Sequence, residues 1–467
     1  MRRLRRKFRS ANPSRSSPLR YLLPGAACLL LFAFYWRGLN CWFLTDDLGW
    51  LHIGIEAHDG GLPGLLKMLF KPRAQGTLRP WSESVYFWSL YRLFGMNPVP
   101  FHLILFLTAC GDLLLLYAIV CRLTGSAWAA AGAQVFWLVN PAIGPGLCCA
   151  SLYNEIQLVF FMLLALWLFM NGRYWFQLTV FIIGLGSLET AVMYPFVASC
   201  YAWLYDRARL RLTVPLYLVS AIYAGLHFWI APTPKTGAYA VSVDSRVLST
   251  LKTYIEMSLG PERLGHFHWT WPVWLITCGT VMMALGVAAA AMAAKRTGAL
   301  GAAWFLVFLT PFLLIPEHRF EFYLIGPVVG LAMILAGALV SRWRAPAIAL
   351  AAIYVAVAIP SAWQVTTWYH ERSLVARDLV LRVVQFGREH PGKTLLLTGM
   401  DTDQFNAAFV RVPFELYGMK DVWLAPGAEA NINDRQWTPL FVPKNAKQLL
   451  DSGQALMLDV SRSRQLR

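Results

Sequence analysis

Long apolar runs separated by short polar gaps make up most of this chain. Several runs are shorter than the roughly 20 residues that a membrane-spanning helix needs, so their ends are approximate. The pattern predicts an all-α polytopic membrane protein with about eleven transmembrane helices. The runs are 21–36, 100–121, 127–141, 153–170, 174–188, 189–205, 213–231, 272–294, 300–316, 323–340 and 346–361.

The composition agrees with a protein of the lipid bilayer. Hydrophobic residues make up 57% of the 467 positions and charged residues 14%, with a mean hydropathy of +0.48. Soluble domains carry about 25% charged residues. The formal charge of +16 would also suit a nucleic-acid partner. However, half of that excess lies in the first 20 residues and much of the rest in short loops, so orientation in the membrane explains it better. We therefore expect no nucleic-acid partner.

Basic residues indicate how the runs cross the membrane. Segment 1–20 has eight basic residues and no acid, which predicts a cytoplasmic tail. If all basic gaps are cytoplasmic, segment 174–205 must be a hairpin with its apex near 186–189, and the C-terminus lies outside. In a bacterial host this means the inner membrane, with a periplasmic C-terminus. The basic gaps hold Arg122, Arg173, Arg207, Arg209, Arg211, Lys295, Arg296, Arg342 and Arg344.

Two extracytoplasmic regions differ from the apolar runs. Within a first loop at 40–99, segment 60–99 is amphipathic and aromatic, which predicts helices lying in the membrane interface. Segment 362–467 contains a helical run followed by the apolar strand pattern 393–398, with turn signals further on. We predict three parts: the tail 1–20, a transmembrane domain 21–361, and a small soluble α/β domain 362–467.

Asp46 and Asp47 follow the first predicted span, at its extracytoplasmic exit. A carboxylate at this depth could act as a general base on a lipid-linked substrate, while its neighbour tunes its pKa or holds a metal or the acceptor. The alternative is structural, because an acidic pair also caps the start of a helix.

Further charged residues occur at predicted loop ends. Arg79 could bind a leaving phosphate, or extend to lipid headgroups. Glu83, four residues later, could pair with Arg79. Glu189 lies inside an apolar hairpin, where an ionisable residue is a functional candidate or part of a helix turn. His102 starts a span and is more typical of interfacial packing.

The turn 316–323 is unusually rich in ionisable groups. Arg319 would be a second phosphate ligand, while Glu317 and His318 could contact an acceptor or a metal. The alternative is a solvated turn with internal ion pairs. Four weaker candidates are Asp112, which could bond a neighbouring helix, and Glu155, His266 and His268. Two histidines without a third ligand are weak evidence for a metal.

Together these segments resemble the GT-C class of membrane glycosyltransferases, including protein O-mannosyltransferases and aminoarabinose transferases. The likeness covers roughly residues 20–361. Leu188 stands where the family usually has Lys, so no role of that Lys is transferred. The segments that carry it are Leu44-Thr45-Asp46-Asp47, Leu78-Arg79-Pro80-Trp81, 91–98 with 101–103, 186–191 with Pro195, and His318-Arg319 with Tyr323.

The resemblance implies an inverting transfer from a polyprenyl-phosphate sugar, with Asp46 or Asp47 as the catalytic base. Arg79 and Arg319 would bind the donor phosphate. The acceptor would be a glycan, lipid or protein of the cell envelope, and a divalent metal ion is left open as a cofactor. A flippase or transporter of a lipid-linked precursor, and an envelope glycan polymerase or ligase, are the alternatives. Residues that could contact the acceptor or support the reacting groups are Glu83, His102, Glu189, Glu317, His318 and Tyr323.

Overall fold

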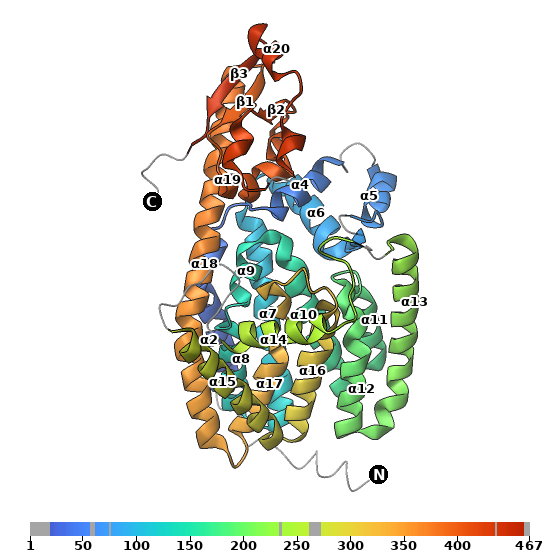
Figure 1. Cartoon of the computed structure of the whole chain (residues 1–467). Coiled ribbons are helices and arrows are strands. Elements are labelled where there is room, and N and C mark those ends of the chain that lie inside the picture. Colours follow the sequence, from blue (N-terminus) through green and yellow to red (C-terminus); the bar gives the residue numbers. More distant parts are fainter. Residues whose placement is uncertain are drawn as a thin grey trace.

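The computed structural model describes residues 19–56, 61–73, 76–232, 236–260, 272–434 and 437–461. It is mostly helical, with one small sheet (Figure 1). Eleven apolar helices correspond to the eleven predicted runs. They are α2 (Leu19–Phe34), α7 (Val99–Thr124), α8 (Ala127–Leu138), α10 (Tyr153–Met170), α11 (Tyr174–Gly184), α12 (Tyr194–Tyr205), α13 (Val214–Ile230), α15 (Val273–Ala293), α16 (Arg296–Leu313), α17 (Val328–Leu339) and α18 (Arg344–Glu389).

Not every one of these helices is long enough to cross a bilayer alone. Among the described residues, six helical segments have the length and apolar composition for it, and three shorter apolar helices accompany them. The number of eleven spans therefore stays a prediction. The six segments are Val99–Thr124, Ala150–Met170, Arg207–Ile230, Val273–Ala293, Arg296–Leu313 and Arg344–Glu389.

Close helix packing forms the centre of the bundle. Nearly every residue of α17 is buried, against α16, α8 and α15. A Cβ at Gly301 would lie 2.5 Å from the carbonyl oxygen of Gly330, so only glycine allows α16 and α17 to approach this closely. By contrast, α13 and α15 expose most of their apolar side chains, as helices facing lipid do.

Reporter fusions test the predicted topology. Fusions after Arg173, Arg209 and Arg342 should report the cytoplasm, and a fusion at the C-terminus should report the periplasm or exterior, because basic loops stay inside. A cytoplasmic C-terminus would contradict the odd number of spans.

Short helices connect the long ones. Those of the first loop are α3 (Trp36–Leu39), α4 (Asp46–Glu56), α5 (Gly61–Leu69), the π-helix η2 (Pro80–Val85) and α6 (Tyr86–Phe94). The helices predicted in 60–99 are thus present, and α4 and α6 lie between the bundle and the sheet (Figure 1). The other short helices of this part are α9 (Ile143–Cys148), η3 (Ala150–Leu152), η4 (Glu189–Met193), η5 (Arg207–Thr213), α14 (Arg246–Leu259) and η6 (Glu321–Leu324).

The break predicted near 186–189 lies between α11 and η4. Gln177 Nε2 of α11 donates to Tyr194 Oη of α12 at 2.9 Å, which links the helices on either side. The expected boundary at 361/362, in contrast, falls inside α18, which runs without interruption from Arg344 to Glu389 (Figure 1). The helix continues because buried residues such as Val365 and Leu379 keep one face packed.

The C-terminal segment contains a parallel three-stranded sheet of order β2-β1-β3. Its strands are β1 (Thr394–Thr398), β2 (Val422–Leu424) and β3 (Ala455–Asp459). In the register, Leu396 aligns with Trp423 and Met457. Residues 395–397 of the central strand are fully buried, as expected inside a parallel sheet. The helices here are α19 (Thr402–Ala407), η7 (Phe409–Arg411), η8 (Pro413–Tyr417), η9 (Ala428–Asn431), η10 (Thr438–Phe441) and α20 (Ala446–Asp451).

Candidate functional site

The two carboxylates that begin α4 have opposite surroundings. Asp47 is fully buried, and its Oδ1 and Oδ2 accept hydrogen bonds from the N–H groups of Ser151 at 2.6 Å and Leu44 at 3.1 Å. Asp46 is 55% exposed and forms an ion pair with Arg411 of η7. Asp47 therefore joins the start of α4 to η3, whereas Asp46 is open to a substrate.

Burial raises the pKa of Asp47 to about 7, against the hydrogen bonds from Ser151, Leu44 and Ala150, which lower it. The buried carboxyl is thus held by hydrogen bonds from neighbouring residues rather than by a cation. This arrangement suits a residue that holds the loop in place.

Replacing Asp47 with Asn should destabilise the protein. The amide keeps one acceptor oxygen but places an NH₂ group against a buried N–H donor, which costs about 1–3 kcal/mol. We expect the purified Asp47→Asn protein to have a lower melting temperature in detergent than the wild type. The melting temperature of Asp46→Asn should be unchanged. Equal melting temperatures of the two variants would contradict this assignment.

Arg79 is the centre of a charge cluster at the start of η2. Its Nε donates to Glu189 Oε2 at 2.8 Å, and its Nη1 donates to Glu83 Oε1 at 2.9 Å. Glu189 Oε1 also accepts from the N–H of Leu78 at 3.1 Å. Within the described chain, Arg79 Nη2 makes no hydrogen bond. The predicted pairing of Arg79 with Glu83 is therefore present, and Glu189 adds a second partner.

Backbone contacts hold the Arg79 loop against the break between α11 and η4. The N–H of Trp81 donates to the carbonyl of Gly186 at 3.1 Å, and Ser82 Oγ donates to the carbonyl of Ser187 at 2.6 Å. A Cβ at Gly186 would lie 2.5 Å from Trp81 Nε1, so this approach requires glycine. The two segments that supply Arg79 and Glu189 are thereby fixed to each other.

Two carboxylates bind this guanidinium, and a third, that of Glu155, acts on it through its charge. Burial lowers the pKa of Arg79, but Glu189, Glu83 and also Glu155 outweigh it and raise that pKa above its ordinary value. Burial raises the pKa of Glu83 to about 7, Arg79 works against the rise, and Glu189 adds to it. For Glu189, burial is outweighed by Arg79, which holds its pKa below the ordinary value. Of the two carboxyls bonded to Arg79, Glu83 therefore retains a proton more readily than Glu189.

This difference predicts a pH effect on stability. Because the pKa of Glu83 is raised in the folded state, its contribution to stability is present below about pH 4.5 and is lost as the pH rises towards 7. Glu83→Gln cannot ionise, so its melting temperature should fall less than that of the wild type between pH 5 and 8. Parallel curves for the two proteins would contradict the assignment.

Aromatic rings pack against the turn 316–323. The rings of His318 and Tyr239 are 4.1 Å apart between centroids, and the ring of Tyr323 stacks on Phe312 at 4.1 Å. Burial lowers the pKa of His318, and the nearby Asp46 carboxylate opposes this. His318 therefore lies within electrostatic reach of Asp46.

Groups of the first loop, the 316–323 turn and the C-terminal segment all affect the pKa of Tyr239. Burial raises the pKa of its phenol, Arg79 opposes the rise, and Asp46 adds to it. A hydrogen bond with Tyr323 and the charge of Arg411 lower the same pKa. The phenol of Tyr239 thus lies against the His318 ring, bonds to Tyr323, and is under the influence of the charges of Asp46 and Arg79.

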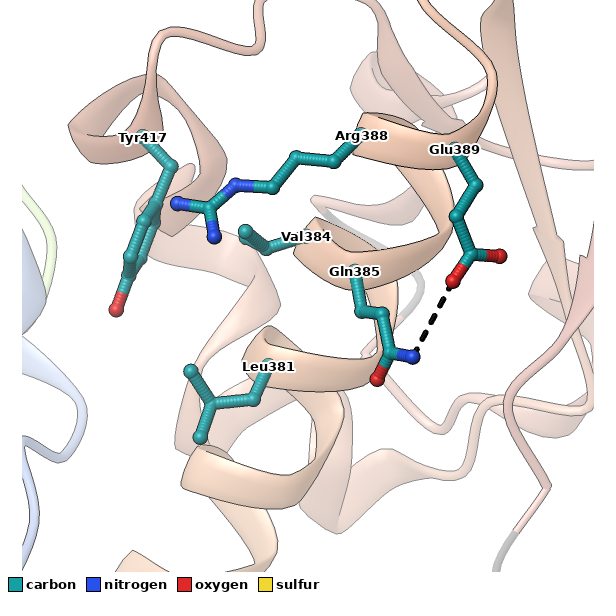
Figure 2. A pocket seen from close by; sticks show the side chains of 6 residues that line it. All are labelled: Leu381, Val384, Gln385, Arg388, Glu389 and Tyr417. Carbon is teal, nitrogen blue, oxygen red and sulfur yellow. Dashed lines mark hydrogen bonds between the residues drawn. The ribbon is translucent and has the colours of Figure 1, made fainter.

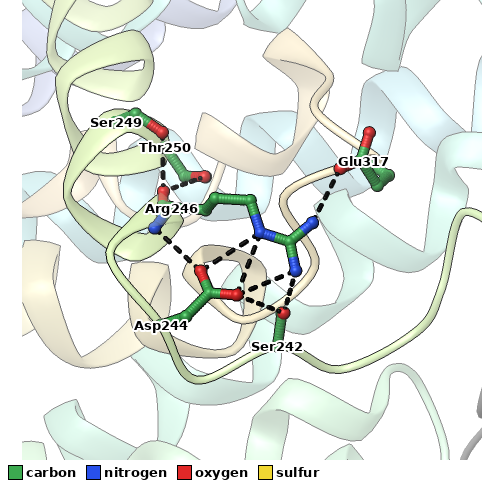
Figure 3. Close-up of polar contacts among 6 residues, drawn as sticks. All are labelled: Ser242, Asp244, Arg246, Ser249, Thr250 and Glu317. Carbon is green, nitrogen blue, oxygen red and sulfur yellow. Dashed lines mark hydrogen bonds and ion pairs between the residues drawn. The ribbon is translucent and has the colours of Figure 1, made fainter.

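Two residues of the turn face other neighbours. Arg319 Nη1 donates to Thr253 Oγ1 of α14 at 3.2 Å. Glu317, 63% exposed, accepts from Arg246 Nη1 at 3.0 Å, and Arg246 also pairs with Asp244 (Figure 3). Glu317 thus has an ion pair with a residue outside the turn, which differs from the alternative of internal ion pairs, and the approach of both arginines to one phosphate stays a prediction.

Other sequence candidates lie apart from this cluster. His102 is fully buried in α7. Asp112 is buried in the same helix, and neither of its carboxylate oxygens has a hydrogen-bond partner among the residues described, so the expected bond to a neighbouring helix is not seen. His266 and His268 lie outside the described residues. In the described ranges no group of three or more His, Cys, Asp or Glu side chains could hold a metal ion.

Sequence reasoning missed two members of the site and gave a third little weight. Glu155 was a weak candidate, and Tyr239 and Arg411 were not candidates. Glu155 lies at the start of a predicted span, where an ionisable residue is a signal for function. Tyr239 and Arg411 reach the site only through tertiary packing, and no local motif marks them.

A cavity of about 480 Å³ lies elsewhere, at the C-terminal end of α18. Figure 2 shows the Arg388 side chain extending towards Tyr417 and the bond of Gln385 to Glu389, which measures 3.2 Å. It contains none of the site residues, so it belongs to a different part of the molecule. Its lining is Leu381, Val384, Gln385, Arg388, Glu389 and Tyr417.

No family model matches this chain, and no curated protein matches it. Two solved structures of ArnT from Cupriavidus metallidurans are similar with a TM-score of 0.47 each. The one bound to undecaprenyl phosphate is 13% identical and covers 94% of this chain and 89% of its own. The apo structure is 15% identical, with 94% and 92% covered. At this level of similarity, the function is inferred from the residues of the chain itself.

Proposed function

We propose that this chain is a membrane glycosyltransferase of the GT-C type, which transfers a sugar from a polyprenyl-phosphate donor to an acceptor of the cell envelope. The observation that carries the proposal is the guanidinium of Arg79, held by Glu189 at 2.8 Å and Glu83 at 2.9 Å in the same first loop as the exposed carboxylate of Asp46. Transfer from a lipid-phosphate sugar requires a base and a cation for the phosphate at the end of an apolar bundle. The exposed carboxylate and the guanidinium are suited to these roles, and aromatic rings lie nearby.

Asp46 is the proposed catalytic base. It removes the proton of an acceptor hydroxyl while the hydroxyl oxygen attacks the anomeric carbon on the face opposite the phosphate. The bond from that carbon to the phosphate oxygen breaks, and the polyprenyl phosphate leaves with the bonding electrons. The product is an inverted glycoside, and the phosphate needs no protonation to leave.

Arg79 is the proposed ligand of the departing phosphate. Its Nε and Nη1 are already bound to Glu189 and Glu83, so Nη2 is the nitrogen that faces the donor. The carboxylates fix the guanidinium plane in advance, which favours stabilisation of charge that develops in the transition state. Among the described residues Arg319 donates to Thr253, and its other donors would complete the phosphate site.

We place the reaction on the extracytoplasmic side of a bacterial inner membrane, with the N-terminus in the cytoplasm. The predicted loop orientation supports this side, because the basic gaps lie at the opposite ends of the helices. The lipid donor would enter from the bilayer. The proposed mechanism needs no metal ion. If a divalent metal ion takes part, Glu317 and His318 are the residues predicted from the sequence to contact it.

The direct test uses the purified full-length protein in lipid nanodiscs. It is incubated with radiolabelled polyprenyl-phosphate sugars and an envelope extract, and the labelled product is identified. We expect label on an envelope acceptor and release of free polyprenyl phosphate.

A second assay in proteoliposomes separates the enzyme from a transporter. Labelled lipid-linked sugar that crosses the bilayer intact, with no glycoside formed, would support a flippase and contradict the enzyme. Growth of a lipid-linked glycan by repeated transfer would identify a polymerase or ligase instead.

A further inference from the structure

The C-terminal segment contacts the first loop next to Asp46. The N–H of Thr45 donates to the carbonyl of Ala407 at 2.7 Å, and Arg411 forms its ion pair with Asp46. Further along α4, His52 Nε2 lies 3.7 Å from Glu415 Oε2. The two segments are about 360 residues apart in the chain, so folding of the C-terminal segment brings Arg411 to this position.

The backbone at this contact is unusual on both sides. Thr45 has φ +50°, and Val412 has φ +51° and ψ +50°. Both are β-branched residues in the left-handed region, which such residues rarely adopt. Thr45 precedes Asp46 and Val412 follows Arg411. Such conformations persist where surrounding contacts enforce them, and they concentrate at functional sites.

We propose that Arg411 is a positioning residue for Asp46, so that the C-terminal segment completes the catalytic centre. The inference rests on the proposed glycosyltransferase function. Asp46 starts α4 and is 55% exposed, so few contacts other than Arg411 hold its carboxylate. One carboxylate oxygen bound to the guanidinium fixes the direction of the other towards the acceptor.

The charges of Arg411 and Arg79 both lower the pKa of Tyr239. Arg411 therefore belongs to the same electrostatic environment as the proposed phosphate ligand. An exposed ion pair adds little to folding stability. Its removal should consequently change turnover more than it changes the melting temperature.

The test compares Arg411→Gln, Arg411→Lys and the control Glu415→Gln in the full-length protein. Arg411→Gln should lower kcat about tenfold, as does loss of other groups that orient a reacting side chain, with little change in the donor KM. Arg411→Lys should recover part of the rate, since it keeps the charge. Glu415→Gln removes a neighbouring contact of the same segment and should keep normal kcat.

A double-mutant cycle separates positioning from a general structural role. Once Asp46 is Asn, Arg411→Gln should change kcat less than twofold, because the residue through which it acts is gone. The inference would be overturned by equal losses of kcat in both backgrounds. It would also be overturned if Arg411→Gln left kcat unchanged, or raised it as removal of an inhibitory contact would. Absence of any product from the wild type would instead remove the proposed function, and this inference with it.

Discussion

Asp46→Asn should lower kcat for sugar transfer by about 100-fold or more, the range expected when a general base is lost. The amide has nearly the same shape as the carboxylate but cannot accept the hydroxyl proton. Asp46 is exposed, and its carboxylate pairs with Arg411 rather than with a backbone N–H of the described residues, so the protein should insert and melt like the wild type. Initial rates with labelled donor, measured at saturating acceptor, test this expectation.

Two variants make the Asp46 result specific. Asp451→Asn changes an exposed carboxylate of α20, away from the site, and should retain normal turnover. Asp47→Asn should lose stability, so its activity is compared at a temperature at which it is still folded. Normal transfer by Asp46→Asn, Asp47→Asn and the double variant together would exclude the mechanism proposed above.

The sequence predicted the helices well because apolar runs of this length have few other solutions. The run at 100–121 became α7, which extends from 99 to 124, and the run at 153–170 became α10 with the same ends. The end of α18 was harder to predict. It passes from an apolar to an amphipathic pattern near 361 without a helix stop signal, and Pro360 is tolerated inside the helix.

The candidate site was predictable only in part. Asp46, Arg79 and Glu189 stood out because charges are costly near apolar sequence. Their pairing was not predictable, since Arg79 and Glu189 meet through the loop contact at Gly186, far along the chain. The different surroundings of Asp46 and Asp47 also depend on a distant residue, because Asp47 is held by the N–H of Ser151.

Arg79 variants should show the second large effect, in both folding and catalysis. Arg79→Ala leaves Glu83 and Glu189 without their shared cation, and loss of one partner of a buried pair costs about 3–5 kcal/mol. Glu83 is only 1% exposed, so water cannot replace the guanidinium there. We expect a melting temperature well below that of the wild type and no detectable transfer.

Arg79→Lys separates charge from geometry. The ammonium restores the charge but cannot place two nitrogens on Glu189 and Glu83 and present a third to the phosphate. Turnover should therefore fall in the order Arg, Lys, Ala. Much of the loss should be in kcat, because charge on the phosphate grows as the sugar leaves. Arg92→Ala, at an exposed arginine of α6, serves as the control and should behave like the wild type.

The double variant Arg79→Ala with Glu83→Gln distinguishes the structural role of Arg79 from its catalytic role. Replacing the buried carboxyl with a neutral amide should restore part of the melting temperature, because the amide does not need the cation that is lost. It should not restore transfer, since no guanidinium faces the donor phosphate. If activity returned together with stability, Arg79 would be a residue of the fold alone, and the phosphate would have to be bound by Arg319 or another cation.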